Sequence, residues 1–337
     1  MRFDRKAGLG IVLSAVLLWW TLHDIDFAAV WGLLRRSNGW LWLASTVVAT
    51  AIFPVRARRW RTILDPVVPR LPFAPLWRAT AVGMMVNNVA PARAGELARP
   101  IVLVRERPDV PFGAALASLA VDRVFDAIVL LLLLFVAPLD TAFPPAARLY
   151  GRSVPALALG TALLTVVLIA GLYAVVIAPE AFARVLARAA RRVAPRWEAR
   201  GAEAVRAFAR GLAVLRDPRR FAAVFAWSLA HWLLCAWSLW IGFRAVGIGA
   251  PFSAALFVNS LQSVASAIPA SPGFFGVFES VSRAGLAVYG VPATLAVSWA
   301  LGYHVLTFVP ITVFGFVHLA QLGLTLRQVA GGSGGDA

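Results

Sequence analysis

Six apolar runs, most of them close to the length that a helix needs to cross a lipid bilayer, constrain the fold of this chain more than any other feature. They lie at about 9–22, 39–55, 114–137, 154–178, 221–247 and 293–322. A helix needs about 20 mainly apolar residues to span the bilayer, where its backbone groups must bond to one another. Hydrophobic residues make up 60% of the chain and charged residues 14%, which excludes a soluble domain. The sequence therefore predicts an all-α polytopic membrane protein, with a single integral-membrane domain over 1–330.

The positions of the basic residues orient the predicted spans. Basic residues precede the first span, follow the second and gather at 184–220, so all three groups fall on one side if six spans are counted. The group after the second span consists of Arg56, Arg58, Arg59 and Arg61. Because positive residues mark the cytoplasmic side, we expect a multi-pass protein of the cell inner membrane with cytoplasmic N- and C-termini.

The net charge of +16 points to anionic partners. Arginines spread over short loops between spans favour anionic lipid headgroups over nucleic acid. Apolar residues at helical spacing within 180–220 predict a cytoplasmic amphipathic segment on the inner leaflet, more simply a charge-anchored loop than a specific lipid sensor. The glycine-rich tail 331–337 is expected to be disordered.

Two further apolar stretches, 73–104 and 252–290, are broken by proline and glycine where water should be scarce. The breaks contain Pro91 and Gly95 in the first stretch, and Pro269 and Pro272 in the second. Irregular backbone at membrane depth is tolerated where protein or a polar cavity satisfies its hydrogen bonds. We interpret both stretches as re-entrant helical hairpins whose tips form a polar cavity near mid-membrane.

The hairpins divide the chain into two similar halves, at about 1–137 and 154–322. Each half would hold two spans, a hairpin and a further span, with the hairpins entering from opposite sides. This order suggests an inverted-topology repeat. The Pro-Ala-x-x-Gly spacing that the breaks share also arises by chance in a chain rich in alanine and glycine, so both interpretations stay open.

Charged residues follow the first break at helical spacing. Arg93, Glu96 and Arg99 would share one side of a helix. Two guanidinium groups there would clamp a lipid phosphate, and Glu96 would orient one of them or contact a cationic headgroup. Asn88, just before the break, would satisfy freed backbone groups. The alternative is that these charges lie at the cytoplasmic interface and extend toward water.

The second break carries the signature of a helix start. Ser271 would cap the helix, Pro272 would occupy its first turn and Gly273 would follow. The unpaired amides of such a helix would hold a phosphate or a carboxylate, and Glu279 is the only acid of this hairpin. The alternative is a turn that merely reverses the chain.

The apolar run 114–137 contains three charged residues within a stretch of five, Asp122, Arg123 and Asp126. Charges inside a span are costly and usually face a partner or a water-filled cavity. Arg123 and Asp126, three residues apart, would pair, and Asp122 would need Arg93 or Arg99 as its cation. A structural ion pair is favoured over a moving proton relay.

The chain shows no metal or nucleotide signature. His231 and His304 lie within apolar runs, where a lone histidine usually bonds to a neighbouring helix. No metal-binding motif, cysteine pair or phosphate-cradling Gly-Lys-Ser/Thr loop is present. We therefore expect no metal, no cofactor and no enzyme activity, and any transport would be downhill or driven by a gradient.

The order of motifs resembles the lysylphosphatidylglycerol synthase transmembrane, or flippase-like, family. The matching motifs are Arg59-Trp60-Arg61, Asn88-x-x-Pro-x-Arg-x-Gly-Glu96, Asp122-Arg123-x-x-Asp126 and Ile268-Pro-x-Ser-Pro-Gly-x-x-Gly-x-x-Glu279. The resemblance covers nearly the whole chain and implies a membrane region that moves a phospholipid between leaflets. The soluble synthase domain of the bifunctional members has no counterpart here, so synthase activity is not implied.

These observations lead to one functional hypothesis and two rivals. The hypothesis is a lipid translocase that holds the phosphate of an anionic or aminoacylated phospholipid with Arg93, Arg99 and the amides after Ser271, while Glu96 and Glu279 contact a cationic headgroup. One rival is an integral-membrane transferase acting on a lipid phosphate, with Asp122 or Glu279 as base. The other is a helper subunit without transport activity for a separate lipid synthase or cell-envelope enzyme.

Overall fold

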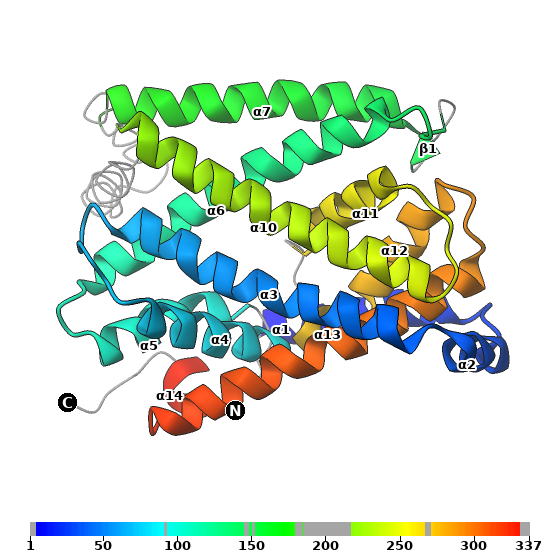
Figure 1. Ribbon diagram of the computed structural model, residues 1–337, viewed down its shortest axis with the longest axis horizontal. Helices are drawn as coiled ribbons and strands as arrows, with labels where there is room; N and C mark the ends of the chain where they lie inside the picture. The colour runs from blue at the N-terminus through cyan, green and yellow to red at the C-terminus, as the bar shows by residue number, and fades with distance from the viewer. Residues whose placement is uncertain are drawn as a thin grey trace.

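The computed structural model describes residues 5–90, 93–144, 148–149, 152–178, 184, 217–266 and 271–330 as a bundle of helices (Figure 1). The six long helices coincide with the six predicted apolar runs. They are α1 (Arg5–Leu22), α3 (Gly39–Leu64), α6 (Phe112–Val136), α7 (Val154–Ile177), α10 (Pro218–Ala245) and α13 (Ala293–Gln321).

Shorter elements connect the long helices and form the two broken stretches. The helices are α2 (Phe27–Arg36), α4 (Phe73–Val89), α5 (Gly95–Glu106), α11 (Phe252–Ala265), α12 (Val277–Ala287) and α14 (Leu326–Ala330). Two 3-10 turns, η1 (Ala137–Leu139) and η4 (Pro272–Phe274), and a two-residue antiparallel pair, β1 (Arg148–Leu149) with β2 (Arg152–Ser153), complete the described chain. The breaks therefore fall where the proline and glycine clusters predict them.

The exterior of the bundle is suited to lipid. Large apolar side chains are exposed along the long helices, with Trp40 of α3 80% exposed and Leu159 of α7 70% exposed. Such extended apolar surface is foreign to soluble monomers. By length and composition α3, α10 and α13 can each cross a membrane, and the second half of α1 joins α2 as a fourth candidate bent by 82°. The polytopic membrane class is thus confirmed, and the number of six spans stays a prediction.

The two central helices, α3 and α10, hold each other by a reciprocal pair of hydrogen bonds. The hydroxyl of Ser45 donates to the carbonyl of Ser238 at 2.8 Å, and the hydroxyl of Ser238 donates to the carbonyl of Ser45 at 2.8 Å. Small hydroxyl residues let membrane helices approach closely. Since α3 and α10 are the second long helix of each half, this pairing suits an inverted repeat, which stays a prediction.

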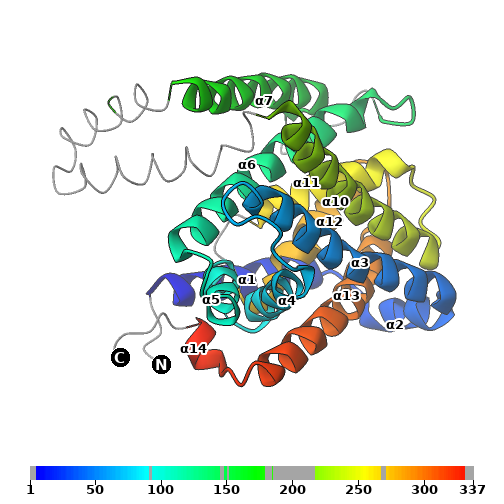
Figure 2. The ribbon, with the colours of Figure 1, turned by 60° about the vertical axis from the view of Figure 1, so that its left-hand side comes forward.

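Each break separates two short helices, which we call a broken helix pair: α4 and α5 in the first stretch, and α11 and α12 in the second. The two broken helix pairs lie toward opposite ends of the bundle. Figure 1 shows α4 and α5 at the left and α11 and α12 at the right, while Figure 2 shows the start of α1 and helix α14 at one end. Two of the long helices begin at a side chain that satisfies free amides: Asn38 accepts from the amides of Trp40 and Leu41 at the start of α3, and Asp217 accepts from that of Arg219 at the start of α10. Helices α6 and α13 instead follow a proline that makes no side-chain cap.

One expectation about the basic residues is wrong. The arginines predicted to follow the second span lie inside helix α3, which continues to Leu64, and Arg56 and Arg59 are buried. Acidic side chains on the neighbouring helix α6 compensate the charge of Arg59, so the helix has no need to end where the apolar run ends. The segment 180–220, apart from Arg184 and 217–220, lies outside the described residues, as do the tail 331–337, Pro91 and Pro269.

Candidate functional site

A cavity with a partly polar lining and a volume of about 330 Å³ lies between the two broken helix pairs and helices α3, α10 and α13. Its charged lining consists of Arg56, Arg93, Glu96 and Arg123. Its uncharged polar lining includes Asn87, Asn88, Gln262, Ser263, Ser266 and Thr307. Polar groups buried in an apolar bundle are costly unless they meet a partner, so their concentration at one place marks a site.

Arg56 is the least satisfied charge of this lining. Arg56 is 7% exposed, and the only described hydrogen bond of its Nη1 is to the sulfur of Met84, at 3.7 Å. The nearest carboxylate oxygens, of Glu96 and Asp122, are each 3.9 Å from Nη2, and neither Nε nor Nη2 has a hydrogen-bond partner among the described residues. A buried guanidinium with free donors favours an anion in the cavity.

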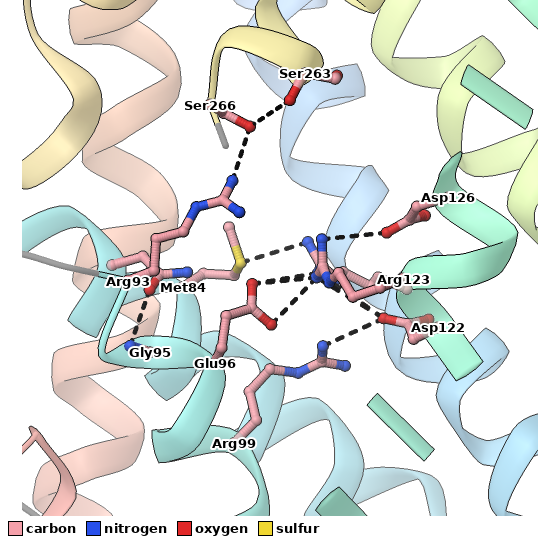
Figure 3. Close-up of polar contacts among 12 residues, drawn as sticks. Met84, Arg93, Gly95, Glu96, Arg99, Asp122, Arg123, Asp126, Ser263 and Ser266 are labelled. Carbon is pink, nitrogen blue, oxygen red and sulfur yellow. Dashed lines mark hydrogen bonds and ion pairs between the residues drawn. The ribbon is translucent and has the colours of Figure 1, made fainter. Parts of the chain in front are cut away.

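Arg93 extends from the first break to the second. Figure 3 shows its side chain pointing away from Glu96 and toward the end of α11, where Nη2 donates to the hydroxyl of Ser266 at 2.7 Å. Its guanidinium also lies 5.5 Å from the ring centre of Phe274, a cation–π contact. Arg93 and Phe274 both have a positive φ, of 56° and 62°. Strained backbone at both breaks is thus held by the contact between them.

Glu96 and Arg123 form the opposite wall. The guanidinium of Arg123 lies 3.1 Å from Glu96 and 3.3 Å from Asp126. Arg123 therefore pairs with Asp126, three residues later in α6, and with Glu96 in the first turn of α5. Glu96 faces Arg123 (Figure 3). It lies farther from Arg56, at 3.9 Å.

Behind the cavity wall lies an ion-pair network that is almost free of solvent. Arg59 is fully buried and contacts Asp122 at 2.5 Å and Asp126 at 2.6 Å. Arg99 lies 3.4 Å from Asp122, with its guanidinium 4.5 Å from the ring centre of Trp60. Such a network ties α3, α5 and α6 together, because losing any member strands a buried charge.

The structure separates the predicted arginine clamp. Arg99 is 1% exposed and is absent from the cavity lining, whereas Arg93 lines the cavity. Asp122 takes Arg59 as its nearest cation, with Arg99 second, and Arg93 makes no described contact with it. The reason is that α4 packs tightly on α5. Because Gly83 has no side chain, the Arg99 side chain passes next to it and points into the core. Arg56 and Arg123 stand in the cavity instead.

The cavity and the network behind it carry a positive excess. Among the described residues, five guanidinium groups face three carboxylates, which leaves two positive charges uncompensated. The groups are Arg56, Arg59, Arg93, Arg99 and Arg123 against Glu96, Asp122 and Asp126. An excess of guanidinium in a cavity favours binding of phosphate or carboxylate.

The second break differs from its prediction. Ser271 caps no helix; its amide donates to the hydroxyl of Ser14 and its hydroxyl donates to the carbonyl of Phe275. Pro272 begins only the short turn η4, because Gly273 has φ 68° and the chain turns again at Gly276, with φ 87°. Helix α12 starts at Val277, six residues later than Ser271, so the predicted anion-binding amides are not formed there.

Glu279, predicted to contact a headgroup, bonds to the protein itself and is absent from the cavity lining. Its Oε2 accepts from the amide of Gly276 at 2.7 Å and its Oε1 lies 2.6 Å from Nδ1 of His304. Nε2 of His304 is 2.8 Å from the carbonyl of Gly273 and donates to it, since a carbonyl only accepts. Glu279 is completely buried. The two residues therefore hold the second break against α13.

The remaining predicted residues find structural partners. Asn88 donates to the hydroxyl of Thr312 at 2.7 Å, and Asn87 rather than Asn88 satisfies the first break by accepting from the amide of Gly95 at 2.9 Å. His231 lines the cavity and packs edge-on against Trp232. No group of three or more His, Cys, Asp and Glu side chains that could hold a metal ion is found among the described residues.

Arg56 and Arg59 are the residues that sequence reasoning missed. The sequence predicts both to follow the second span, because they lie beyond the apolar run 39–55. The missed signal is helical spacing: Ile52, Arg56, Arg59 and Ile63 recur every three or four residues and share one buried face of α3. The two acids within 114–137, Asp122 and Asp126, required cations of this kind.

The fold and this site together define an integral membrane protein with a cationic cavity in its interior. The model of the lysylphosphatidylglycerol synthase TM region matches residues 8–315, and the chain belongs to this family. The chain is 26% identical over 335 residues to a UPF0104 membrane protein of Methanothermobacter thermautotrophicus, covering 93% of each chain. It is 22% identical over 322 residues to a UPF0104 membrane protein of Pyrococcus horikoshii, covering 91% of this chain and 93% of that one. A shorter match, 37% identical over 120 residues, covers 36% of this chain and 19% of glycosyltransferase AglD of Haloferax volcanii.

Proposed function

We propose that this protein moves a lipid phosphate between membrane leaflets through the cavity between its two broken helix pairs, without chemical change to the lipid. The observation that carries the proposal is the unsatisfied guanidinium of Arg56, supported by Arg93 and Arg123 in the same lining. These groups would hold the phosphate while the acyl chains remain outside the protein, in lipid. The broken pairs would act as re-entrant hairpins, the arrangement that transporters use at mid-membrane.

The transferase alternative has less support. Its two candidate bases, Asp122 and Glu279, are completely buried, absent from the cavity lining and bonded to Arg59 and His304. A general base must come within hydrogen-bond reach of the proton that it removes. We therefore favour translocation over catalysis.

A second candidate is a helper subunit. The partial match to a glycosyltransferase favours this role, because it places a related segment in a protein named for sugar transfer. In that case the cavity would bind a lipid substrate and hand it to a separate enzyme without moving it across the membrane.

A reconstituted exchange assay tests the proposal. Purified protein in liposomes with fluorescent anionic phospholipid should accelerate leaflet exchange, and the double variant Arg56→Met, Arg93→Gln should slow it. Each charge-assisted hydrogen bond is worth about 1.5 to 3 kcal/mol, so each lost arginine should weaken lipid binding roughly ten- to a hundredfold. Arg58→Met, an exposed neighbour on the same helix, is the control.

The outcomes separate the candidates, provided that the thermal stability of each variant is measured alongside. Wild-type exchange rates in a stable double variant would remove the guanidinium groups from the mechanism. A new lipid product would identify an enzyme, and lipid binding without exchange or product would identify a helper.

Orientation belongs to the same proposal: the inner membrane, with both termini in the cytoplasm. A single cysteine in place of Ala337, in a Cys235→Ala background, should resist an impermeant thiol reagent in intact cells. Labelling from outside would reverse the topology.

A further inference from the structure

The uncharged wall of the cavity contains three side-chain amides. Each forms a described hydrogen bond with either its oxygen or its nitrogen, but not with both. Asn87 accepts with Oδ1 from Gly95, Asn88 donates with Nδ2 to Thr312, and Gln262 donates with Nε2 to Ser282. The other ends, Nδ2 of Asn87, Oδ1 of Asn88 and Oε1 of Gln262, have no partner among the described residues, and none of the three is sealed from solvent.

These free ends are one donor and two acceptors. Hydroxyl groups suit such a mixture, because each hydroxyl both donates and accepts. Ser263 adds acceptor capacity, since its own proton goes to the carbonyl of Asn259. Phosphate is held by donors alone, so this wall faces something other than the phosphate.

The cavity offers little to a cationic headgroup. Glu96 is the one acid in its described lining, and it is already 3.1 Å from Arg123 and 3.9 Å from Arg56. Glu279, the other acid expected to contact such a headgroup, is enclosed by His304 and Gly276. An ammonium group would face an excess of guanidinium, and like charges at contact distance repel each other.

Aromatic side chains do not reverse this preference. Phe274 and Phe278 line the cavity, and aromatic faces attract cations, but the ring of Phe274 already carries the guanidinium of Arg93 at 5.5 Å. Flat aromatic faces also pack well against the C–H faces of a sugar ring. The volume of about 330 Å³ is at the low end of the range for ligand pockets, roughly 300 to 1,000 Å³, which fits a headgroup and not acyl chains.

We propose that the cavity takes a phosphate ester whose headgroup is a neutral polyol, a sugar or a glycerol, and that it disfavours an ammonium headgroup. The guanidinium groups of Arg56, Arg93 and Arg123 bind the phosphate, and Asn87, Asn88 and Gln262 bind the hydroxyl groups. This inference deepens the proposed function and rests on the same cavity. Its cargo would come either from diacyl phospholipids or from polyprenyl-phosphate sugars, which share this chemistry.

Binding of soluble headgroups tests the inference without requiring transport. Calorimetry on the purified protein should show that hexose 1-phosphate and glycerol 1-phosphate bind at least tenfold more tightly than phosphoethanolamine. Gln262→Leu should weaken the better polyol phosphate about three- to tenfold, as expected for one lost neutral hydrogen bond, and leave inorganic phosphate unchanged. Gln321→Leu, on the exposed end of α13, is the matched control.

Exchange assays then identify the source of the cargo and separate the two proposals. Liposomes would carry phosphatidylglycerol, lysyl-phosphatidylglycerol or a polyprenyl-phosphate hexose, each with a labelled headgroup. Faster exchange of one polyol lipid names the source. Equal or tighter binding of phosphoethanolamine, or equal or faster exchange of the lysyl lipid, would overturn the headgroup inference and leave translocation standing. Tight polyol phosphate binding without exchange of any lipid would overturn translocation and keep the headgroup inference.

Discussion

The two broken helix pairs resemble each other in sequence and differ in what they do with their charged residues. Both breaks contain proline and glycine, a non-glycine residue with positive φ and a glutamate at the start of the following helix. In the first break Arg93 and Glu96 line the cavity. In the second, Glu279 is completely buried and the cavity receives Gly273, Phe274 and the hydroxyl groups at the end of α11.

The difference follows from how each break satisfies its backbone. In the first break one neutral side chain, Asn87, accepts from the amide of Gly95, so the charges are left for the cavity. In the second break Glu279 and His304 bond to the backbone of Gly276 and Gly273, so this pair is occupied by the protein itself. Irregular backbone inside an apolar bundle must be satisfied internally. A glutamate near a break can therefore serve either the ligand or the fold, and its solvent exposure tells which.

The largest expected effect comes from the network that supports the first break. Arg59→Met removes the nearest cation of both Asp122 and Asp126, and breaking a buried pair by removing one partner costs about 3 to 5 kcal/mol. The variant should show a large loss of yield and melting temperature in detergent. Arg58→Met, the exposed neighbour, should melt like the wild type. Equal melting of both variants would mean that the arginine network contributes nothing to holding α3 against α6.

The two glutamates should respond oppositely if the comparison is correct. Glu279→Leu leaves the amide of Gly276 and Nδ1 of His304 without their partner, at about 1 to 3 kcal/mol for each buried group. It should lower the melting temperature, whereas Glu96→Leu should change it less and should alter lipid binding instead. Thermal melting and the exchange assay, run on both variants, measure this. A stable Glu279→Leu variant with altered lipid selectivity would show that both breaks serve the ligand.

Close helix packing next to the first break gives a moderate effect. A Cβ on Gly95 would lie 1.8 Å from the carbonyl oxygen of Gly83 and 2.5 Å from Oδ1 of Asn87. Gly95→Ala should therefore separate α4 from α5 and cost about 1 to 3 kcal/mol, as overpacking does. Gly113→Ala meets open space at the start of α6 and should be neutral or slightly stabilising. A thermal melt that ranks the two variants in the reverse order would contradict this packing.

The smallest effect is expected at the exposed contact between α12 and the turn that follows α1. Arg283 of α12 donates to Asp24, in the turn after α1, at 2.6 Å, and this bond lowers the pKa of Asp24 to about 2. Because the pKa is depressed below the usual value of about 3.9, the contribution to stability is present above that value and is lost as the pH falls through 2. Asp24→Asn should remove the small melting difference between pH 6 and pH 2 that this bond contributes. If Asp24→Asn leaves the melting difference between pH 6 and pH 2 unchanged, other groups cause that difference.

The positions of the six long helices and of the two breaks were predictable from the sequence, whereas helix α2 lies in a segment expected to be a loop. Apolar runs of bilayer length predict helices because lipid leaves the backbone no other partner, and proline with glycine interrupts a helix wherever it occurs. The pairing of Arg123 with Asp126 also follows from spacing alone, because residues three apart are neighbours on any helix. The sequence thus predicted a cavity at the pair of breaks where the structure has one.

Only the tertiary structure decided which charges face the cavity. The sequence presents Arg93 and Arg99 as equivalent, yet the packing of α4 on α5 turns Arg99 into the core and leaves Arg93 at the second break. It likewise presents Arg56 and Arg59 as residues that follow the second span, although acids on α6 allow α3 to carry both inside the bundle. Local sequence determines where a helix can form and which residues share a face. Which partner meets that face depends on helices distant in the chain, and this decides whether a charge is neutralised by the protein or left for a ligand.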